Sequence, residues 1–257
     1  MASLVELCEG MDFTLIKYQE LLVALKKSGI PFKLRHDVDM LPYNSLRTAQ
    51  IEKTQGLFAT YYFRMVPESY DEGVIKSISG LGHEIGYHYE SLTTCNGDME
   101  AAYKDFCRNL DKLRTLVPIS SICMHGSPRS KWDSRDMWNH YDYHVLGIDY
   151  EPYFDTDFAT TLYLTDTGRR WDGYHVSVRD KIPVFQEQWE SQGLVFHSTD
   201  DIIHQLNNVE SPLCRLRYSL LITTHPQRWN PFGIRYIKEY CFQSLKNIIK
   251  RFLVLSK

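Results

Sequence analysis

Short apolar segments alternate with helical segments along this chain, and this alternation restricts the fold more than any other feature. Five apolar segments resemble buried strands in their β-branched and aromatic content; they are residues 30–34, 57–65, 83–90, 119–124 and 219–224. Apolar residues at helical spacing occupy other segments, which are residues 15–25, 45–56, 71–82 and 97–116. Because strand–helix–strand repeats build parallel sheets, we predict an α/β fold. The number of units favours an incomplete (β/α) barrel, with residues 1–257 in a single domain.

Two further segments extend this pattern. Residues 194–206, "LVFHSTDDIIHQL", are predicted to begin as a strand that leads into polar residues. Near the end of the chain one apolar stripe recurs at helical spacing; it consists of Ile234, Ile237, Cys241, Leu245, Ile248 and Phe252. We expect this last helix to pack against the sheet, and a helix lying on a membrane surface is the alternative.

Charge and cysteine content argue against several classes of protein. The net charge of -3 arises from 29 basic and 32 acidic residues mixed along the chain, so we expect no nucleic-acid partner. The N-terminus lacks a basic segment followed by an apolar core, and no run of about 18 apolar residues predicts a transmembrane segment. Six cysteines at irregular spacings fit reduced thiols better than disulfides, and we therefore expect a cytoplasmic protein.

The segment "LRHDVD" ends an apolar run with His36, Asp37 and Asp39. The two aspartates are two residues apart, so on an extended strand they face the same side while His36 faces the other. Neighbouring carboxylates repel each other. A divalent cation relieves this repulsion, and the same coupling can hold one carboxylate as a general base. A solvated pair of carboxylates and a magnesium or calcium loop are the alternatives that this motif leaves open.

The segment "HEIGYHYE" contains His83 and His88 at a spacing that does not match a zincin helix. Five residues turn a helix by about 140°, and on a strand the two rings point in opposite directions. We therefore expect only His88, at the strand end, to reach a shared site. His83 and Glu84 are expected to form a buried hydrogen-bonded pair that holds the sheet. Tyr89 is a wall residue or, because aromatic rings suit the faces of sugars, a substrate contact.

Two more histidines follow apolar strands. His125 lies in "MHGSP", and it supplies the third ligand that Asp39 and His88 lack for a catalytic zinc ion with an open position. His225 lies in "TTHPQRW", where a histidine can serve as general acid. A hydrogen-bonded loop histidine is the alternative for His225. Arg228 follows in the same segment and is a candidate for substrate binding.

The segment "YLTDTGRRWDG", residues 163–173, is dense in groups that bind anions or sugars. Arg169 suits bidentate contacts with an anion, and Trp171 suits stacking on a sugar ring. A salt-bridged surface loop is the alternative.

These motifs occur in an order that resembles the polysaccharide deacetylase (NodB-homology) superfamily, known as carbohydrate esterase family 4. The resemblance rests on "RHDVD", "GHEIGYHYE", a proline turn after the next strand and a late "LITTHP", and it covers about residues 34 to 230. "MHGSP", "YLTDTGRRWDG", "RDKIP" and "THPQRW" are similar to a branch found in bacterial surface-polysaccharide biosynthesis, that is, lipopolysaccharide O-antigen or capsule. The resemblance implies a distorted (β/α) barrel that holds one divalent metal ion, usually zinc. It also implies hydrolysis of the N-acyl group, in most cases N-acetyl, of an amino sugar.

The resemblance assigns roles to the two aspartates. Asp37 matches the leading aspartate of the family motif TFDDG, which is the catalytic base. The family's metal-binding aspartate falls at Val38, so that role passes to Asp39, as in relatives that separate the two acids by one residue.

The resemblance also assigns roles to the histidines. His88 matches the first histidine of the second motif, but the second histidine is replaced by Leu92, so one standard ligand is missing. His125 is the candidate replacement, at a position where the family usually has an arginine that orients the base. His225 matches the late histidine that serves as general acid or supports the leaving group.

Since no export signal is evident, we expect the substrate to be a nucleotide-linked or lipid-linked amino sugar on the cytoplasmic side of the membrane. Two alternatives remain for the function. One is a sugar-binding barrel that has lost catalysis, and the other is a metal-dependent amidohydrolase for a small non-sugar amide. No motif predicts an oligomeric state.

Overall fold

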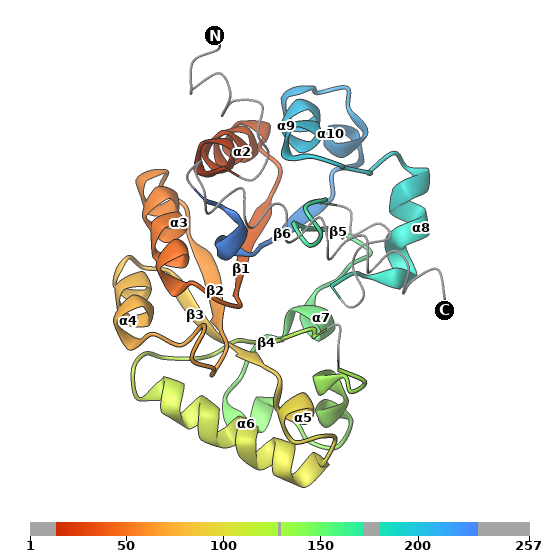
Figure 1. Ribbon diagram of the computed structural model, residues 1–257. Helices are drawn as coiled ribbons and strands as arrows, with labels where there is room; N and C mark the ends of the chain where they lie inside the picture. Colours follow the sequence, from red (N-terminus) through yellow and green to blue (C-terminus); the bar gives the residue numbers. More distant parts are fainter. Residues whose placement is uncertain (1–13, 128–129, 172–179, 231–257) are drawn as a thin grey trace. The chain divides into compact units, whose positions relative to one another are not determined.

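The computed structural model describes residues 14–127, 130–171 and 180–230 (Figure 1). The chain divides into two compact units. Unit 1 comprises Met1–Leu34 and Asp157–Lys257, and unit 2 comprises Arg35–Thr156. The first boundary lies inside strand β1 (Phe32–Val38), so this strand begins in unit 1 and ends in unit 2. That residues 1–257 form a single domain stays a prediction.

Unit 2 consists of strands that alternate with helices. After β1 the elements are α3 (Pro42–Thr54), β2 (Ala59–Phe63), α4 (Glu72–Gly80), β3 (Glu84–Tyr89), α5 (Ser91–Thr94), α6 (Met99–Arg114), β4 (Ile122–Met124), η1 (Ser134–Asn139), η2 (His144–Leu146) and α7 (Pro152–Asp155). The strand order is β4-β3-β2-β1. Strand β3 pairs in parallel with both β2 and β4. Helices α3 and α4 contact β2 and β3, beside which they lie in Figure 1.

A glycine fixes the close approach of β2 and β3. Gly86 is paired with Tyr62, and a Cβ atom added at Gly86 would lie 2.4 Å from the Tyr62 ring. The Tyr62 hydroxyl in turn accepts a hydrogen bond of 3.0 Å from Ser121, the residue before β4. Any side chain at Gly86 would therefore displace a buried ring that lies across three neighbouring strands.

The opposite face of the strands carries a buried polar cluster beneath α3. His36 and Glu52 are both fully buried, and their Nε2 and Oε1 atoms lie 2.6 Å apart. The Tyr61 hydroxyl donates to Glu52 Oε2 at 2.7 Å. His36 therefore faces away from the side of β1 that carries Asp37, as the alternation of a strand predicts.

The predicted pair of His83 and Glu84 does not form. His83 is buried, and its ring nitrogens bind the Ala59 amide at 3.2 Å and the Ala49 carbonyl at 2.9 Å. Glu84 is exposed and accepts a hydrogen bond of 2.6 Å from the Thr60 hydroxyl. The prediction was right that His83 is structural but wrong about its partner, because adjacent residues of an extended chain point to opposite faces.

Unit 1 contains the remaining elements. They are α2 (Leu15–Ser28), the start of β1, β5 (Thr161–Thr165), α8 (Pro183–Ser191), α9 (Thr199–Asn207), α10 (Pro212–Leu216), β6 (Ser219–Thr224) and η3 (Pro226–Arg228). Strand β6 lies between β1 and β5 in the strand order and pairs in parallel with β5. Helix α2 packs against α9 and ends at Gly29, whose positive φ of 68° is the predicted stop signal.

The prediction that residues 194–206 begin with a strand is wrong. Leu194, Val195 and Phe196 form no strand, and α9 begins directly afterwards. The cause is a capping box, in which Ser198 and Asp201 bond each other's backbone amides. The helix start thus takes the polar residues that follow Phe196. The apolar stripe from Ile234 to Phe252 lies outside the described residues.

The described part of the chain contains six strands that alternate with helices, and the pairs β2–β3, β3–β4 and β5–β6 are parallel. This confirms the α/β prediction. Within the described residues the strand order ends at β4 and β5 and contains six strands instead of the eight of a closed (β/α) barrel, in agreement with the predicted incomplete barrel. Within the same residues, no helix is both long and apolar enough to cross a membrane.

Candidate metal centre

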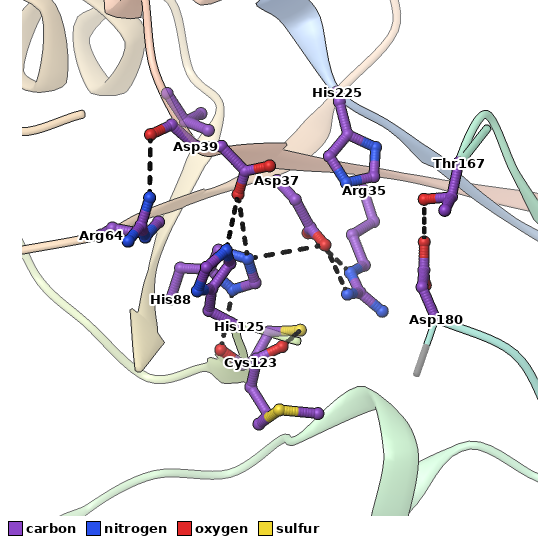
Figure 2. A network of polar contacts seen from close by, with 12 residues as sticks. Arg35, Asp37, Asp39, Arg64, His88, Cys123, His125, Thr167, Asp180 and His225 are labelled. Atoms are coloured by element: carbon purple, nitrogen blue, oxygen red, sulfur yellow. Dashed lines mark hydrogen bonds and ion pairs between the residues drawn. The ribbon is translucent and has the colours of Figure 1, made fainter. Parts of the chain in front are cut away.

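Three charged side chains at the end of β1 share one face. Arg35, Asp37 and Asp39 occupy alternate positions, and the first two are almost fully buried. Arg35 donates from Nε to Asp37 Oδ1 at 2.9 Å and from Nη2 to Asp37 Oδ2 at 2.7 Å. This bidentate contact fixes the orientation of the Asp37 carboxylate and neutralises its charge in a buried position (Figure 2).

His88, near the end of β3, points its Nε2 atom toward both aspartates. Its Nδ1 atom lies 2.9 Å from the carbonyl oxygen of Cys123. A carbonyl oxygen only accepts, so Nδ1 carries the proton and Nε2 holds the lone pair. Nε2 lies 3.6 Å from Asp39 Oδ1 and 3.7 Å from Asp37 Oδ2. Burial lowers the pKa of His88 to about 4, although the nearby Asp37 charge opposes the shift, and the ring is therefore neutral at neutral pH.

His125 directly follows β4, and Glu90 holds its ring. The His125 Nδ1 atom lies 2.8 Å from Glu90 Oε2, and its Nε2 atom lies 3.5 Å from Asp39 Oδ1. Arg64 also donates to Glu90, from Nε at 2.9 Å. Burial favours a raised pKa for Glu90, but the hydrogen bond from His125 and the charges of His125 and Arg64 outweigh it and lower the pKa to about 2. The ionised Glu90 keeps the proton of His125 on Nδ1, which leaves Nε2 as the atom directed at Asp39.

These atoms have the spacing of metal ligands. Asp39 Oδ1, His88 Nε2 and His125 Nε2 all lie within 4.8 Å of one another. The separations of 3.5 and 3.6 Å between nitrogen and oxygen are too long for good hydrogen bonds. Ligand atoms at about 2.1 Å from a tetrahedral zinc ion would be about 3.4 Å apart, which is close to these values. The structure thus brings the three predicted ligands together, and their role as ligands stays a prediction.

A second group of donors overlaps the first. Asp37, His88 and Cys123 each offer one atom, and these atoms also lie within 4.8 Å of one another. Leu92, at the position of the family's second histidine, is buried in α5 and offers no donor. The residues that can hold an ion in unit 2 therefore come from β1, β3 and β4 and the residues that follow them.

In unit 1 the predicted acid His225 is bound to Asp166. The His225 Nδ1 atom lies 2.6 Å from Asp166 Oδ1, and Arg228 Nη1 donates to the same oxygen at 2.6 Å. The Trp229 indole donates to Asp166 Oδ2 at 2.9 Å. Burial favours a raised pKa for Asp166, but the charges of Arg228 and His225 and the hydrogen bonds from His225 lower it. Asp166 thus fixes the tautomer of His225 and engages Arg228, which was predicted to bind substrate.

The predicted substrate contacts Trp171 and Tyr89 both lie in the interior, and their role in substrate binding stays a prediction. Trp171 is fully buried, and its indole donates to Thr199 Oγ1 at 3.0 Å. Tyr89 is fully buried as well, and its hydroxyl accepts a hydrogen bond of 2.9 Å from the Trp138 indole. Neither ring has a face open to a sugar, because each is packed in the interior with its polar atom bound internally. For Arg169 and Arg228 a substrate contact stays a prediction.

Three residues of the candidate metal centre, Arg35, Glu90 and Cys123, were not predicted from the sequence. Arg35 lies two positions before Asp37, and Cys123 lies two positions before His125. Because side chains two residues apart on a strand share a face, the sequence places Arg35 with Asp37 and Cys123 with His125. Glu90, the last residue of "HEIGYHYE", lies two positions after His88, so the same period applies to it.

Comparisons with known proteins found likenesses among solved structures. No family model matches the sequence, and no curated protein matches it. Among solved structures, a CE4 esterase from Streptococcus mutans is similar to this chain with a TM-score of 0.44 and 13% sequence identity. The alignment covers 95% of this chain and 90% of that one.

Proposed function

We propose that this protein is a metal-dependent hydrolase that removes an N-acyl group, most simply acetyl, from an amino sugar. The observation that carries the proposal is the arrangement in unit 2, where Asp39, His88 and His125 direct one donor atom each at a common point. Asp37 lies beside them, with its Oδ2 atom 3.7 Å from His88 Nε2. Three protein ligands and a neighbouring carboxylate are the usual components of a hydrolytic metal site.

Zinc is the ion that a set of two imidazoles and one carboxylate favours. A bound zinc ion lowers the pKa of water and polarises a carbonyl group, which is the chemistry that amide hydrolysis requires. His88 and His125 are prepared as ligands, because each holds its proton on Nδ1 through a fixed acceptor, the Cys123 carbonyl and Glu90.

In the proposed reaction Asp37 is the general base. Its carboxylate is held by two hydrogen bonds from Arg35, so it is ionised and its direction is fixed before substrate binds. It accepts the proton of the attacking water. His225 is proposed to donate a proton to the departing amine. Asp166 stabilises the protonated form of that ring through the bond at Nδ1.

The substrate class follows the resemblance to polysaccharide deacetylases. We propose an N-acetylated amino sugar linked to a nucleotide or to a lipid, handled in the cytoplasm during synthesis of a bacterial surface polysaccharide such as O-antigen or capsule. Arg169 and Arg228 are the proposed contacts for an anionic part of this substrate.

The first measurement is the metal content, by elemental analysis of protein purified without chelator. The second is the release of amine from nucleotide-linked N-acetyl sugars, from lipid-linked N-acetyl sugars and from simple acetamides. Asp37→Asn is expected to keep about one metal ion per chain and to lower turnover by a factor of about 10² to 10⁴. Asp39→Ala and His88→Ala are expected to lose both metal and turnover. Exposed residues provide the controls, since Asp142→Asn and His144→Ala should leave both unchanged.

Each outcome decides between functions. Turnover of acetamides but not of sugars would replace the proposal with a small-amide hydrolase. Sugar binding without metal would replace it with a non-catalytic binding protein. Near wild-type activity of Asp37→Asn would remove Asp37 from the role of base.

A further inference from the structure

The candidate metal centre has donor atoms at two levels along the strands. Asp37 and Asp39 are two residues apart on β1 and its continuation, and Cys123 and His125 are two residues apart on β4 and its continuation. Two residues of an extended strand span about 6.6 Å. Asp39 and His125 form the upper level, and together with His88 they are the three predicted zinc ligands. Asp37 and Cys123, each two residues earlier on its strand, form a lower level.

His88 belongs to both levels. It is paired with Cys123 in the register of β3 and β4, so the two side chains project from the same face of the sheet. Its Nε2 atom lies 3.6 Å from the upper carboxylate of Asp39 and 3.7 Å from the lower carboxylate of Asp37. Asp37, His88 and Cys123 are all buried, and their donor atoms lie within 4.8 Å of one another.

One nitrogen lone pair binds one ion. The Nδ1 proton of His88 is donated to the Cys123 carbonyl, so Nε2 is the ligand atom for either level. An ion at the lower level therefore excludes an ion at the upper level. The two sets also differ in chemistry, because the lower set contains a thiolate, which is the softest of these ligands and favours a soft cation such as cadmium more than imidazole or carboxylate does.

We propose that Asp37, His88 and Cys123 form a second, mutually exclusive metal position that takes thiophilic divalent cations such as cadmium. On binding, the S–H bond of Cys123 breaks, the proton passes to solvent and a sulfur–metal bond forms, with no change of oxidation state. Arg35 donates one hydrogen bond to each oxygen of the Asp37 carboxylate, and a carboxylate oxygen can accept from more than one partner.

An ion at this position has a functional consequence, which rests on the proposed function. It engages Asp37, the proposed base, and it removes His88 from the upper set. Cadmium is therefore expected to inhibit hydrolysis in competition with zinc. The binding itself does not depend on any hydrolytic activity, so the two are tested separately.

The test is a titration of the metal-free full-length chain with cadmium. Binding is measured as the ultraviolet absorption of the thiolate-to-cadmium charge-transfer band. Asp39→Asn removes a ligand of the upper set alone and should retain the band. Cys123→Ser should lose the band and bind cadmium at least about 10-fold more weakly, while its zinc affinity changes by less than about 3-fold. Cys214→Ser, which alters a half-buried thiol in unit 1, is the matched control and should behave as wild type.

A second measurement uses the unaltered chain. Cadmium-113 NMR of the wild-type protein should show a resonance in the range of sites with one thiolate ligand. A resonance typical of nitrogen and oxygen ligands alone would overturn the proposal. So would a charge-transfer band that persists in Cys123→Ser. A cysteine-dependent band in a chain that hydrolyses no amide would support this metal position and reject the proposed function, whereas zinc-dependent hydrolysis without the band would do the reverse.

Discussion

Replacing Arg35 by methionine should destabilise unit 2 strongly, because it would leave the Asp37 charge buried without its guanidinium partner. The two side chains are 2% and 4% exposed, and they are joined by two hydrogen bonds of 2.9 and 2.7 Å. Breaking a buried ion pair by removing one partner costs about 3–5 kcal/mol. Methionine keeps much of the apolar stem between Tyr62 and Tyr153, over whose rings the guanidinium lies, so lost packing should contribute less.

The assay is urea denaturation of the metal-free protein, with a double-mutant cycle that combines Arg35→Met with Asp37→Asn. Each single change leaves one buried charge without its ionic partner, whereas the double variant leaves a buried neutral amide but no buried charge, so the cycle should show a coupling energy of about 2 kcal/mol or more. Arg108→Met is the control, because Arg108 is 73% exposed in its pair with Asp105 and should matter by less than about 1 kcal/mol. If Arg35→Met costs less than about 1 kcal/mol, or if the two changes add within about 0.5 kcal/mol, the Arg35–Asp37 pair does not have the role argued here.

Two further predictions concern the carboxyl groups of Glu90 and Glu151 in unit 2. Glu90→Gln should weaken zinc binding by about 10- to 100-fold, because Glu90 holds the His125 ring, and competition with a chromogenic chelator measures the change. Burial raises the pKa of Glu151 from its usual value to about 7, so the folded chain keeps a proton that the unfolded chain releases from about pH 4.5 upward. The contribution of Glu151 to the free energy of unfolding is therefore full below pH 4.5 and declines by up to about 3 kcal/mol as the pH rises to 7. Thermal unfolding at a series of pH values should show this decline in the wild type and not in Glu151→Gln.

The alternation of side chains along a strand accounts for what the sequence predicted well. It placed Asp37 and Asp39 on one face and His36 on the other, and the bond between His36 and Glu52 on the α3 side confirms the second half of that prediction. It also separated His83 from His88. These are local consequences of backbone geometry, and they hold whatever the strand packs against.

Burial of individual aromatic residues was not predictable in the same way. Trp171 and Tyr89 follow or end strands, where wall residues and substrate contacts have the same sequence signature. Whether such a ring is covered depends on distant residues, here Thr199 for Trp171 and Trp138 for Tyr89. Residues so far apart in the chain are brought together by tertiary packing, which the pattern of one segment does not encode.

The composition of the candidate metal centre depends on register, which the sequence does not specify by itself. A slip of one residue between β3 and β4 would turn Cys123 and His125 to the opposite face and leave His88 without both. The close packing of Tyr62 over Gly86, and the bond from Ser121 to Tyr62, oppose such a slip because they tie β2, β3 and β4 together at one level. The same contacts therefore fix which thiol and which imidazole face His88, and a larger residue at Gly86 should disturb metal binding although it lies outside both donor sets.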